Sequence, residues 1–208
     1  EEKDYVTFLY YLKLYLSNPE DLKKESTHPR ILYKIMNLNL SKEIDLIAFS
    51  LMPNHFHLQV KQHPLDGIEK LTRRVLTSYA QYFNKKYDRR GPLFESTYKA
   101  ILLENDAQHL YLSAYIHRNP MKLKSDKLNL VNFSSYPYYL GFRKASWVKP
   151  EEILSFFNNP EGTGEFNNLT YKDFVLDFRE NPENILKELI LTRCWSLSLA
   201  PSLKNEYD

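Results

Sequence analysis

The 208-residue sequence predicts an α+β fold, in which amphipathic helices cover an antiparallel sheet. Apolar side chains alternate along short segments, as in half-buried strands, and recur every three to four residues along longer ones, as in helices. After about residue 128 the sequence becomes aromatic and rich in Ser and Pro, and helical segments follow. We therefore expect two domains, residues 1–128 and a mostly helical C-terminal appendage over residues 129–208.

The first domain is expected to alternate between helices and strands. Its expected elements are a helix over 2–16, a short helix over 30–41, strands over 43–51 and 55–61, a helix over 67–87, a strand over 97–103 and a helix from 105 to about 118. Asp66 is placed to cap the long helix, and Asn119-Pro120 to close the last one. With one further strand before residue 1, this order would be a ferredoxin-like split βαβ unit, so that first strand is absent here.

The appendage is expected to consist of short helices joined by polar segments. Helical patterns occur near residues 150–157, 170–179 and 182–194. A stretch rich in Asn, Gly and Pro over residues 158–168 predicts a linker.

The composition bounds the class of protein. Hydrophobic residues make up 43% of the chain and charged residues 26%, which predicts a packed core and excludes wholesale disorder. The single cysteine, Cys194, excludes an internal disulfide and a cysteine zinc cage. The sequence has no signal-peptide pattern and no run of about 18 apolar residues, so we expect a cytoplasmic protein without a membrane partner.

His55 and His57 stand at alternate positions of the second expected strand. Polar and apolar side chains alternate over residues 55–61, so the two histidines share one face with Gln59 and Lys61. Two imidazoles at this spacing can bind one metal ion, and a third ligand would have to come from elsewhere in the chain. A surface strand that carries two histidines without a ligand would show the same pattern.

Tyr115 and Asn119 lie one turn apart on the last expected helix of the first domain. A phenol beside an amide oxygen suits a nucleophile beside a metal ligand. The chain has 16 Tyr, however, and Tyr111 and Tyr115 could equally be half-buried packing residues. His117 is close to Tyr115 in the sequence but faces another side of the helix, so we do not expect it to act as a base.

A basic and aromatic stretch lies between the histidines and the tyrosine. Residues 70–99 hold eight Lys or Arg and only two acidic residues, a local charge of +6 against +2 for the whole chain. Six Tyr or Phe interleave with these cations between residues 79 and 98. Cations follow phosphates and aromatic rings stack on bases, which favours contact with a single-stranded nucleic acid. The alternative is a solvated helix face with ordinary core aromatics.

Several motifs occur in one order along the chain. They are Met52-Pro53-Asn54-His55-Phe56-His57-Leu58, Ser78-Tyr79-Ala80-Gln81-Tyr82-Phe83-Asn84-Lys85-Lys86-Tyr87, Gly91-Pro92-Leu93-Phe94, Tyr115-Ile116-His117-Arg118-Asn119-Pro120-Met121-Lys122 and Ser134-Ser135-Tyr136. Together they resemble the REP-associated tyrosine transposases, which are relatives of the single-tyrosine HUH transposases of small insertion sequences. The resemblance covers roughly residues 1–157. It implies the ferredoxin-like unit, with the HUH strand at its centre and the tyrosine on a following helix.

The resemblance also implies a function, a metal-dependent transesterase that nicks and rejoins hairpin-containing single-stranded DNA through a 5′-phosphotyrosine. His55 and His57 match the metal ligands and Tyr115 matches the nucleophile. Asn119 falls where insertion-sequence relatives carry a Gln that completes the metal site, and an amide oxygen could bind Mg²⁺ or Mn²⁺ there. The implied partner is single-stranded or hairpin DNA, bound by a monomer or a homodimer.

The stretch and its flanks supply candidate contacts to that DNA. The candidates are Arg73, Arg74, Tyr79, Tyr82, Asn84, Lys85, Lys86, Arg89, Arg90, Lys99, Arg118 and Lys122. Two other functions fit the same residues. A domesticated relative would bind nucleic acid without cutting it, and a metal-dependent hydrolase would use His55 and His57 with Tyr115 in a structural role.

Overall fold

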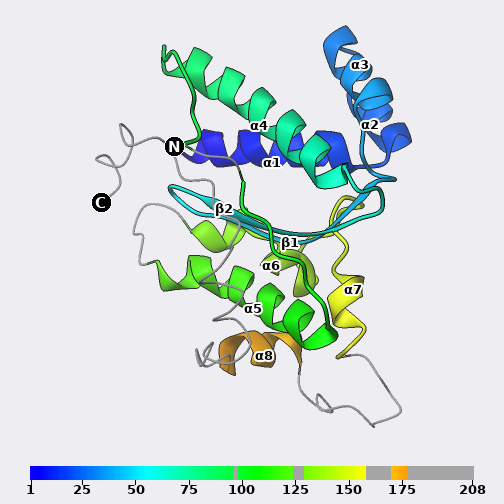
Figure 1. Ribbon diagram of the computed structural model, residues 1–208, viewed down its shortest axis with the longest axis vertical. Coiled ribbons are helices and arrows are strands. Elements are labelled where there is room, and N and C mark those ends of the chain that lie inside the picture. Colours follow the sequence, from blue (N-terminus) through cyan, green and yellow to red (C-terminus); the bar gives the residue numbers. More distant parts are fainter. Residues whose placement is uncertain (96–97, 124–128, 158–169, 178–208) are drawn as a thin grey trace.

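The computed structural model describes residues 1–95, 98–123, 129–157 and 170–177, and within them a two-stranded sheet lies between two layers of helices (Figure 1). The strands β1 (Ile44–Leu51) and β2 (Phe56–Gln62) pair antiparallel, as predicted. The N–H of Met52 donates to the carbonyl of His55 at 2.9 Å, which closes a tight turn between them. The register shifts between Leu46 and Ala48, where β1 has one residue more than its partner.

Four helices lie on one side of the sheet, α1 (Glu2–Leu16), α2 (Pro19–Glu25), α3 (Pro29–Asn37) and α4 (Gly67–Lys86). The predicted helices over 2–16 and 67–87 are confirmed as α1 and α4. The prediction over 30–41 corresponds to the shorter α3, and α2 was not predicted. A Cβ atom at Gly67 would lie 2.9 Å from the side chain of Ile44, so the absence of a side chain lets α4 begin directly against the sheet.

The other side of the sheet is covered by α5 (Asp106–Lys122) together with η1 (Leu130–Phe133), α6 (Tyr136–Tyr139) and α7 (Glu151–Leu154), and α8 (Tyr171–Asp177) packs on α5. The Asn105 side chain accepts from the N–H of Gln108, which caps α5 at the predicted start. The predicted end at Arg118 is wrong, because α5 continues through Pro120. A proline in the last turn removes only one helical hydrogen bond, so it does not stop the helix there.

The strand expected over residues 97–103 does not form in the part of that segment that the structure describes, residues 98–103. A cavity of about 240 Å³ separates Ile101, Leu102 and Leu103 from the outer edge of β2. A strand needs a hydrogen-bonded neighbour about 4.8 Å away. The apolar run therefore lies beside the sheet without joining it, and Leu102 is 79% exposed.

Residues after 129 add to the core beneath and around the sheet. Ser134 forms an isolated bridge with Ser50, and Phe133 and Trp147 belong to the same apolar core as α1 and α4. The helices α7 and α8 fall within the predicted segments 150–157 and 170–179. The linker over 158–168, the helix over 182–194 and Cys194 lie outside the described residues, and the domain division at residue 128 stays a prediction. None of the described helices has the length and apolarity to cross a membrane.

Candidate active site

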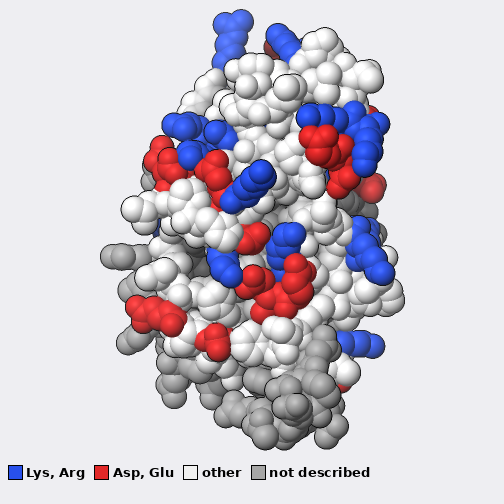
Figure 2. All heavy atoms as spheres, turned by 90° about the vertical axis from the view of Figure 1, so that its right-hand side faces the viewer, with Lys and Arg blue, Asp and Glu red and all other residues white. Residues whose placement is uncertain are grey.

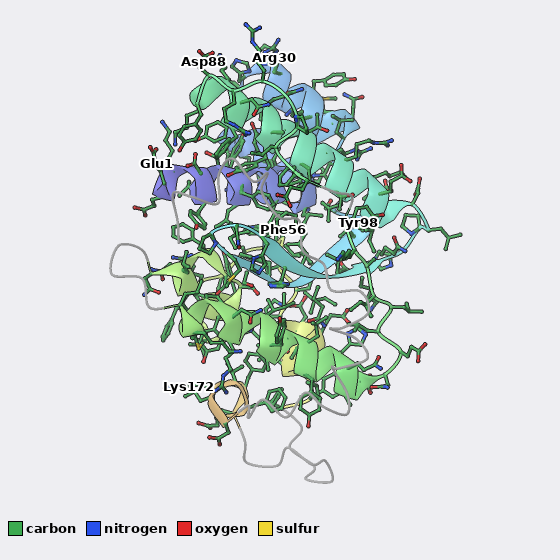
Figure 3. All side chains as sticks on the ribbon, turned by 60° about the vertical axis from the view of Figure 1, so that its left-hand side comes forward. Glu1, Arg30, Phe56, Asp88, Tyr98 and Lys172 are labelled. Atoms are coloured by element: carbon green, nitrogen blue, oxygen red, sulfur yellow. The ribbon has the colours of Figure 1, made fainter. Side chains whose placement is uncertain are left out.

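The two faces of β2 point to different layers, as the alternation predicts. Phe56, Leu58 and Val60 belong to the core shared with α1 and α4, and Figure 3 shows Phe56 between the sheet and those helices. His57 and Gln59 face α5, since the His57 ring contacts Tyr115 and the Gln59 amide donates to the carbonyl of His109 at 3.2 Å. The sheet therefore separates an apolar side from a side that holds polar groups.

The two histidines converge on one point. The Nε2 atoms of His55 and His57 are 3.1 Å apart, and the rings lie at 86° to each other. Two histidine nitrogens that each lie about 2.1 Å from the same ion can be about 3 Å apart, so the pair fits one divalent metal ion. Among the described residues, no set of three His, Cys, Asp or Glu side chains gathers to complete such a site. Within the part of the chain that the structure describes, a further protein ligand would therefore be of another type, such as an amide.

The residue before His55 sets its tautomer. The Asn54 side-chain oxygen lies 2.7 Å from His55 Nδ1 and can only accept, so the ring proton stays on Nδ1. The lone pair of Nε2 is then directed toward His57. Burial lowers the pKa of His55, which keeps the ring neutral, and a metal ligand must be neutral.

Tyr115 lies against this pair. Its ring centroid is 5.7 Å from that of His57, with the rings at 76°. The side chain is half-buried and packs on the core between the sheet and α8. Asn119, one turn later on α5, is 9% exposed. The fold thus brings Tyr115 beside the pair of His55 and His57, from which it is far apart in the sequence.

A buried histidine fixes the helix that carries Tyr115. The Nδ1 atom of His117 is 2.7 Å from the Tyr171 hydroxyl, and its Nε2 is 2.6 Å from the Ser135 hydroxyl. Ser135 Oγ also accepts from the N–H of Phe49 at 2.8 Å. His117 therefore joins α5 to β1 and to α8, and burial lowers its pKa to about 3. The expectation that His117 faces away from the tyrosine's chemistry agrees with this position.

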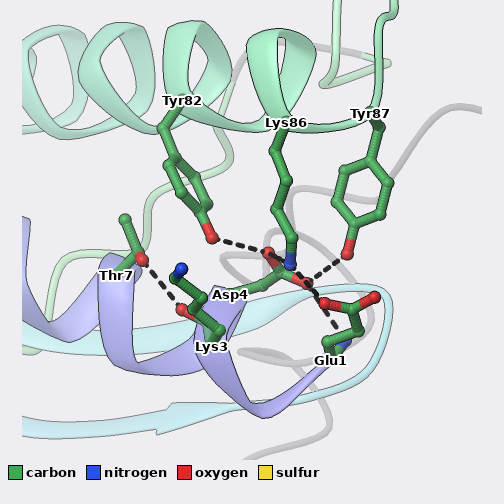
Figure 4. A network of polar contacts seen from close by, with 7 residues as sticks. All are labelled: Glu1, Lys3, Asp4, Thr7, Tyr82, Lys86 and Tyr87. Atoms are coloured by element: carbon green, nitrogen blue, oxygen red, sulfur yellow. Dashed lines mark hydrogen bonds and ion pairs between the residues drawn. The ribbon is translucent and has the colours of Figure 1, made fainter.

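Several candidate DNA contacts are engaged within the protein. Arg73 pairs with Glu69, Arg74 donates to Leu38, Asn84 donates to Gly91, and Arg118 donates to the carbonyls of Val175 and Leu176. Tyr82 and Lys86 donate to Asp4 (Figure 4), and Tyr79 is 9% exposed. Arg89 is partly buried, and the remaining candidates, Lys85, Arg90, Lys99 and Lys122, are exposed, as is Arg73.

Charge is evenly mixed on the face that Figure 2 shows. Lys and Arg side chains interleave there with Asp and Glu, and no continuous basic area is visible among the described residues of that face. The ion pairs of Lys61 with Glu152 and of Lys70 with Glu43 show how neighbouring charges offset each other.

Sequence reasoning missed two polar partners of the site. Asn54 could have been found from its position, because a residue that directly precedes a ligand histidine can bond its ring. The pairing of Gln59 with His109 spans 50 residues and leaves the buried Oε1 atom of Gln59 without a hydrogen-bond partner. No local pattern signals that contact.

Comparisons with known proteins gave a match to a family model whose range spans this site. The family model described as "Transposase IS200 like" matches residues 18–119. That range includes both histidines, Tyr115 and Asn119. No curated protein and no solved structure gave a match.

Proposed function

Because this chain belongs to the family of IS200-like transposases, we propose that it is a metal-dependent transesterase of single-stranded DNA. The family supplies the coarser statement, that the protein is a transposase which cuts DNA and transfers strands. The proposal adds that the substrate contains a hairpin and that Tyr115 forms a covalent 5′-phosphotyrosine. The observation that carries it is the contact of Tyr115 with a histidine pair whose Nε2 atoms are 3.1 Å apart.

The donor set suits a divalent metal ion. His55 and His57 would hold Mg²⁺ or Mn²⁺ through their Nε2 atoms, and Asn119 would contribute its amide oxygen. When bound, such an ion supplies positive charge that stabilises the phosphate in the transition state. The Asn54 side chain keeps the His55 lone pair available, and α5 holds Asn119 one turn from Tyr115.

Tyr115 carries out the covalent step. Its phenol loses a proton, and the oxygen attacks the phosphorus atom of one phosphodiester. A phosphorus–oxygen bond to the tyrosine forms while the bond to the 3′ oxygen breaks, and that oxygen takes up a proton. The reverse attack by a free 3′-hydroxyl rejoins DNA without a nucleotide cofactor. The buried contacts of His117 hold α5, and so Tyr115, in place against β1 and α8.

We also propose that the sheet and its helices belong to a ferredoxin-like unit. The cavity beside β2 is bounded on its far side by Ile101, Leu102 and Leu103. An additional strand in that space would pair with β2 and give the apolar run over residues 98–103 a neighbour. This placement supports the order of elements expected for a split βαβ unit.

The proposed path of the DNA backbone follows the cations that the fold leaves exposed. Lys85, Arg90, Lys99 and Lys122 are exposed and therefore accessible to phosphates. The DNA would have to lie closer to the protein to reach four further candidates, Arg73, Arg74, Arg89 and Arg118. The proposal also includes DNA contacts from the side of the sheet that α4 covers, near the aromatic core. These would be made by Tyr79, Tyr82, Asn84 and Lys86.

A covalent adduct tests the proposed function. The protein is incubated with a pool of single-stranded DNA hairpins and Mn²⁺, and adducts are separated on a denaturing gel. We expect an adduct that Tyr115→Phe abolishes and that EDTA prevents. Tyr111→Phe is a matched control, since Tyr111 is half-buried on the same helix and packs on the same core. Adduct formation by Tyr115→Phe would overturn the proposal. Binding that survives EDTA, with no adduct on any DNA, would favour a non-catalytic binding protein.

A further inference from the structure

A cavity lined with aromatic rings lies between the sheet and the layer of α1 and α4. Its aromatic residues come from α1, β2, α4 and the segment after α4, and they are Tyr5, Phe8, Phe56, Tyr79, Phe83 and Phe94. The space open to the centres of water-sized groups is about 70 Å³. One water molecule needs roughly 10–15 Å³ on that measure, so the cavity has room for a ring system.

The walls form one continuous aromatic surface. Phe8 lies 4.9 Å from Phe56 and 5.1 Å from Tyr79, measured between ring centroids. Phe94 lies 6.4 Å from both Phe56 and Tyr79 and closes the cavity from the side of the chain that follows Gly91. Phe94 is half-buried, whereas Phe8, Phe56 and Tyr79 are buried. A planar apolar group in this space would therefore meet ring faces and edges on several sides.

The polar residues at the cavity favour a neutral ligand over a negatively charged one. Asn54 and His55 line one part, and Asp4 lines another. Burial raises the pKa of Asp4, but hydrogen bonds from Lys86, Tyr87 and Tyr82 more than offset this effect, so the pKa lies below its ordinary value. The carboxylate is therefore ionised at neutral pH and repels a phosphate. An uncharged heterocycle meets no such penalty.

We propose that this cavity binds the nucleobase of a nucleotide that adjoins the phosphate held at the histidine pair. The inference rests on the proposed function and names a subsite for its substrate. His55 belongs both to the histidine pair and to the cavity wall, so a nucleotide can place its phosphate at one and its base in the other. Stacking on aromatic rings is how single strands are held, and it tolerates different bases.

Photo-crosslinking tests the occupant without any need for cleavage. The probe is a pool of random single-stranded DNA in which thymine is replaced by 5-iodouracil, which crosslinks to aromatic rings that stack on it. We expect crosslinked peptides that contain Tyr5, Tyr79 or Phe94, and about a 10-fold lower yield in Phe94→Ala. Phe94→Leu keeps the apolar packing but removes the ring, and should lose crosslinking similarly. Phe142→Ala is the matched control, since Phe142 is 80% exposed and lies outside the cavity.

A second measurement separates failure of this inference from failure of the proposed function. Substrates with an abasic site beside the cleaved phosphate should give about 10-fold less adduct in the natural sequence and little further loss in Phe94→Leu. Unchanged adduct yield on every abasic substrate, or crosslinks only to rings outside the cavity, would overturn the nucleobase subsite. Crosslinks within the cavity without an adduct on any DNA would instead overturn the transesterase and leave the subsite standing.

Discussion

The two helical layers that cover the sheet are fastened by different chemistry. On one side, the Asp4 carboxylate of α1 accepts from Tyr82 at 3.0 Å, Lys86 at 2.8 Å and Tyr87 at 2.7 Å (Figure 4). On the other side, the neutral ring of His117 bonds two hydroxyl groups in the interior. The first network uses a charge near the surface, and the second uses no charge at all.

This difference bears on the proposed chemistry. The buried network around His117, which holds the helix that carries Tyr115, consists of groups that stay neutral at physiological pH, so it adds no fixed charge beside the histidine pair. The layer that carries most of the candidate DNA contacts uses Lys86 as a structural cation. A phosphate that recruited Lys86 would have to draw it away from Asp4 and Glu1.

Replacing His117 should break the neutral network and produce the largest effect. The variant His117→Ala leaves the hydroxyls of Tyr171 and Ser135 without their partner in the interior and creates a void. We expect the free energy of unfolding to fall by about 3–4 kcal/mol, measured by urea denaturation. The control His63→Ala, at a half-exposed residue paired with Asp45, should change it by less than about 1 kcal/mol. A loss below 1 kcal/mol in His117→Ala would show that the network contributes little.

Acidification should weaken the same network without any mutation. The folded pKa of His117 is about 3, whereas the unfolded ring titrates near 6.5. The unfolded state therefore binds a proton that the folded state excludes, and stability falls as the pH drops from 6.5 toward 3. At pH 5 the loss from this residue should be about 2 kcal/mol relative to pH 7.

The measurement is urea denaturation at both pH values, in the natural sequence and in His117→Gln. The variant lacks the titrating ring, so its stability should depend less on pH. Burial also lowers the pKa values of His55 and His109, and their contributions are common to both proteins. An equal pH dependence in the two proteins would exclude His117 as the cause.

Neutralising Asp4 should have a smaller effect, and one that salt reduces. In Asp4→Asn the Lys86 ammonium loses a carboxylate partner, and we expect a loss of about 1–2 kcal/mol in the free energy of unfolding at low salt. Because Lys86 is partly exposed, the loss should shrink at 1 M NaCl. Glu20→Gln breaks the exposed pair with Lys23 and should cost about 0.5 kcal/mol or less. A salt-independent loss would point to packing rather than charge.

The smallest expected effect concerns DNA binding, and it compares the exposed Lys85 with Lys86, which is paired within the protein. Lys85→Ala should lower the affinity for single-stranded DNA about threefold and reduce the slope of log K against log salt by about 0.7. Lys86→Ala should change that slope less, since its charge is already paired within the protein, while it lowers stability. Binding titrations at several salt concentrations measure both slopes. Equal changes in slope would mean that Lys86 leaves Asp4 to contact the DNA.

Periodic patterns in the sequence predicted the helices and strands that are amphipathic over their own length. The alternation around His55 and His57 fixed the face they share, and amphipathic spacing located α1, α4 and the start of α5. The strand over 97–103 was wrong, because its apolar run has no hydrogen-bonded neighbour. The contacts of His117 with Ser135 and Tyr171 could not be read from spacing, since they join segments 18 and 54 residues apart.

In the candidate site, too, local spacing predicted some features, whereas contacts between distant segments required the structure. Period-two spacing was sufficient to pair the two histidines on one face of a strand. The contact of Tyr115 with His57 depends on how α5 packs on the sheet, and only the family resemblance anticipated it. The link from Asp4 to α4 also needed the structure, because α1 and α4 are separated by the whole hairpin.

The irregularity at Ile47 gives β1 two phases. Before it, the even-numbered Ile44 and Leu46 belong to the core with α1 and α4, and after it the odd-numbered Phe49 and Leu51 do, while Ile47 itself packs on the opposite side. Deleting this one residue would join the two phases into one regular alternation, in which Ile44, Leu46, Phe49 and Leu51 still face the same core, and would remove the buried Ile47 side chain from the opposite side. The layer that carries Tyr115 would then lose one buried apolar contact, although no residue of α5 had changed.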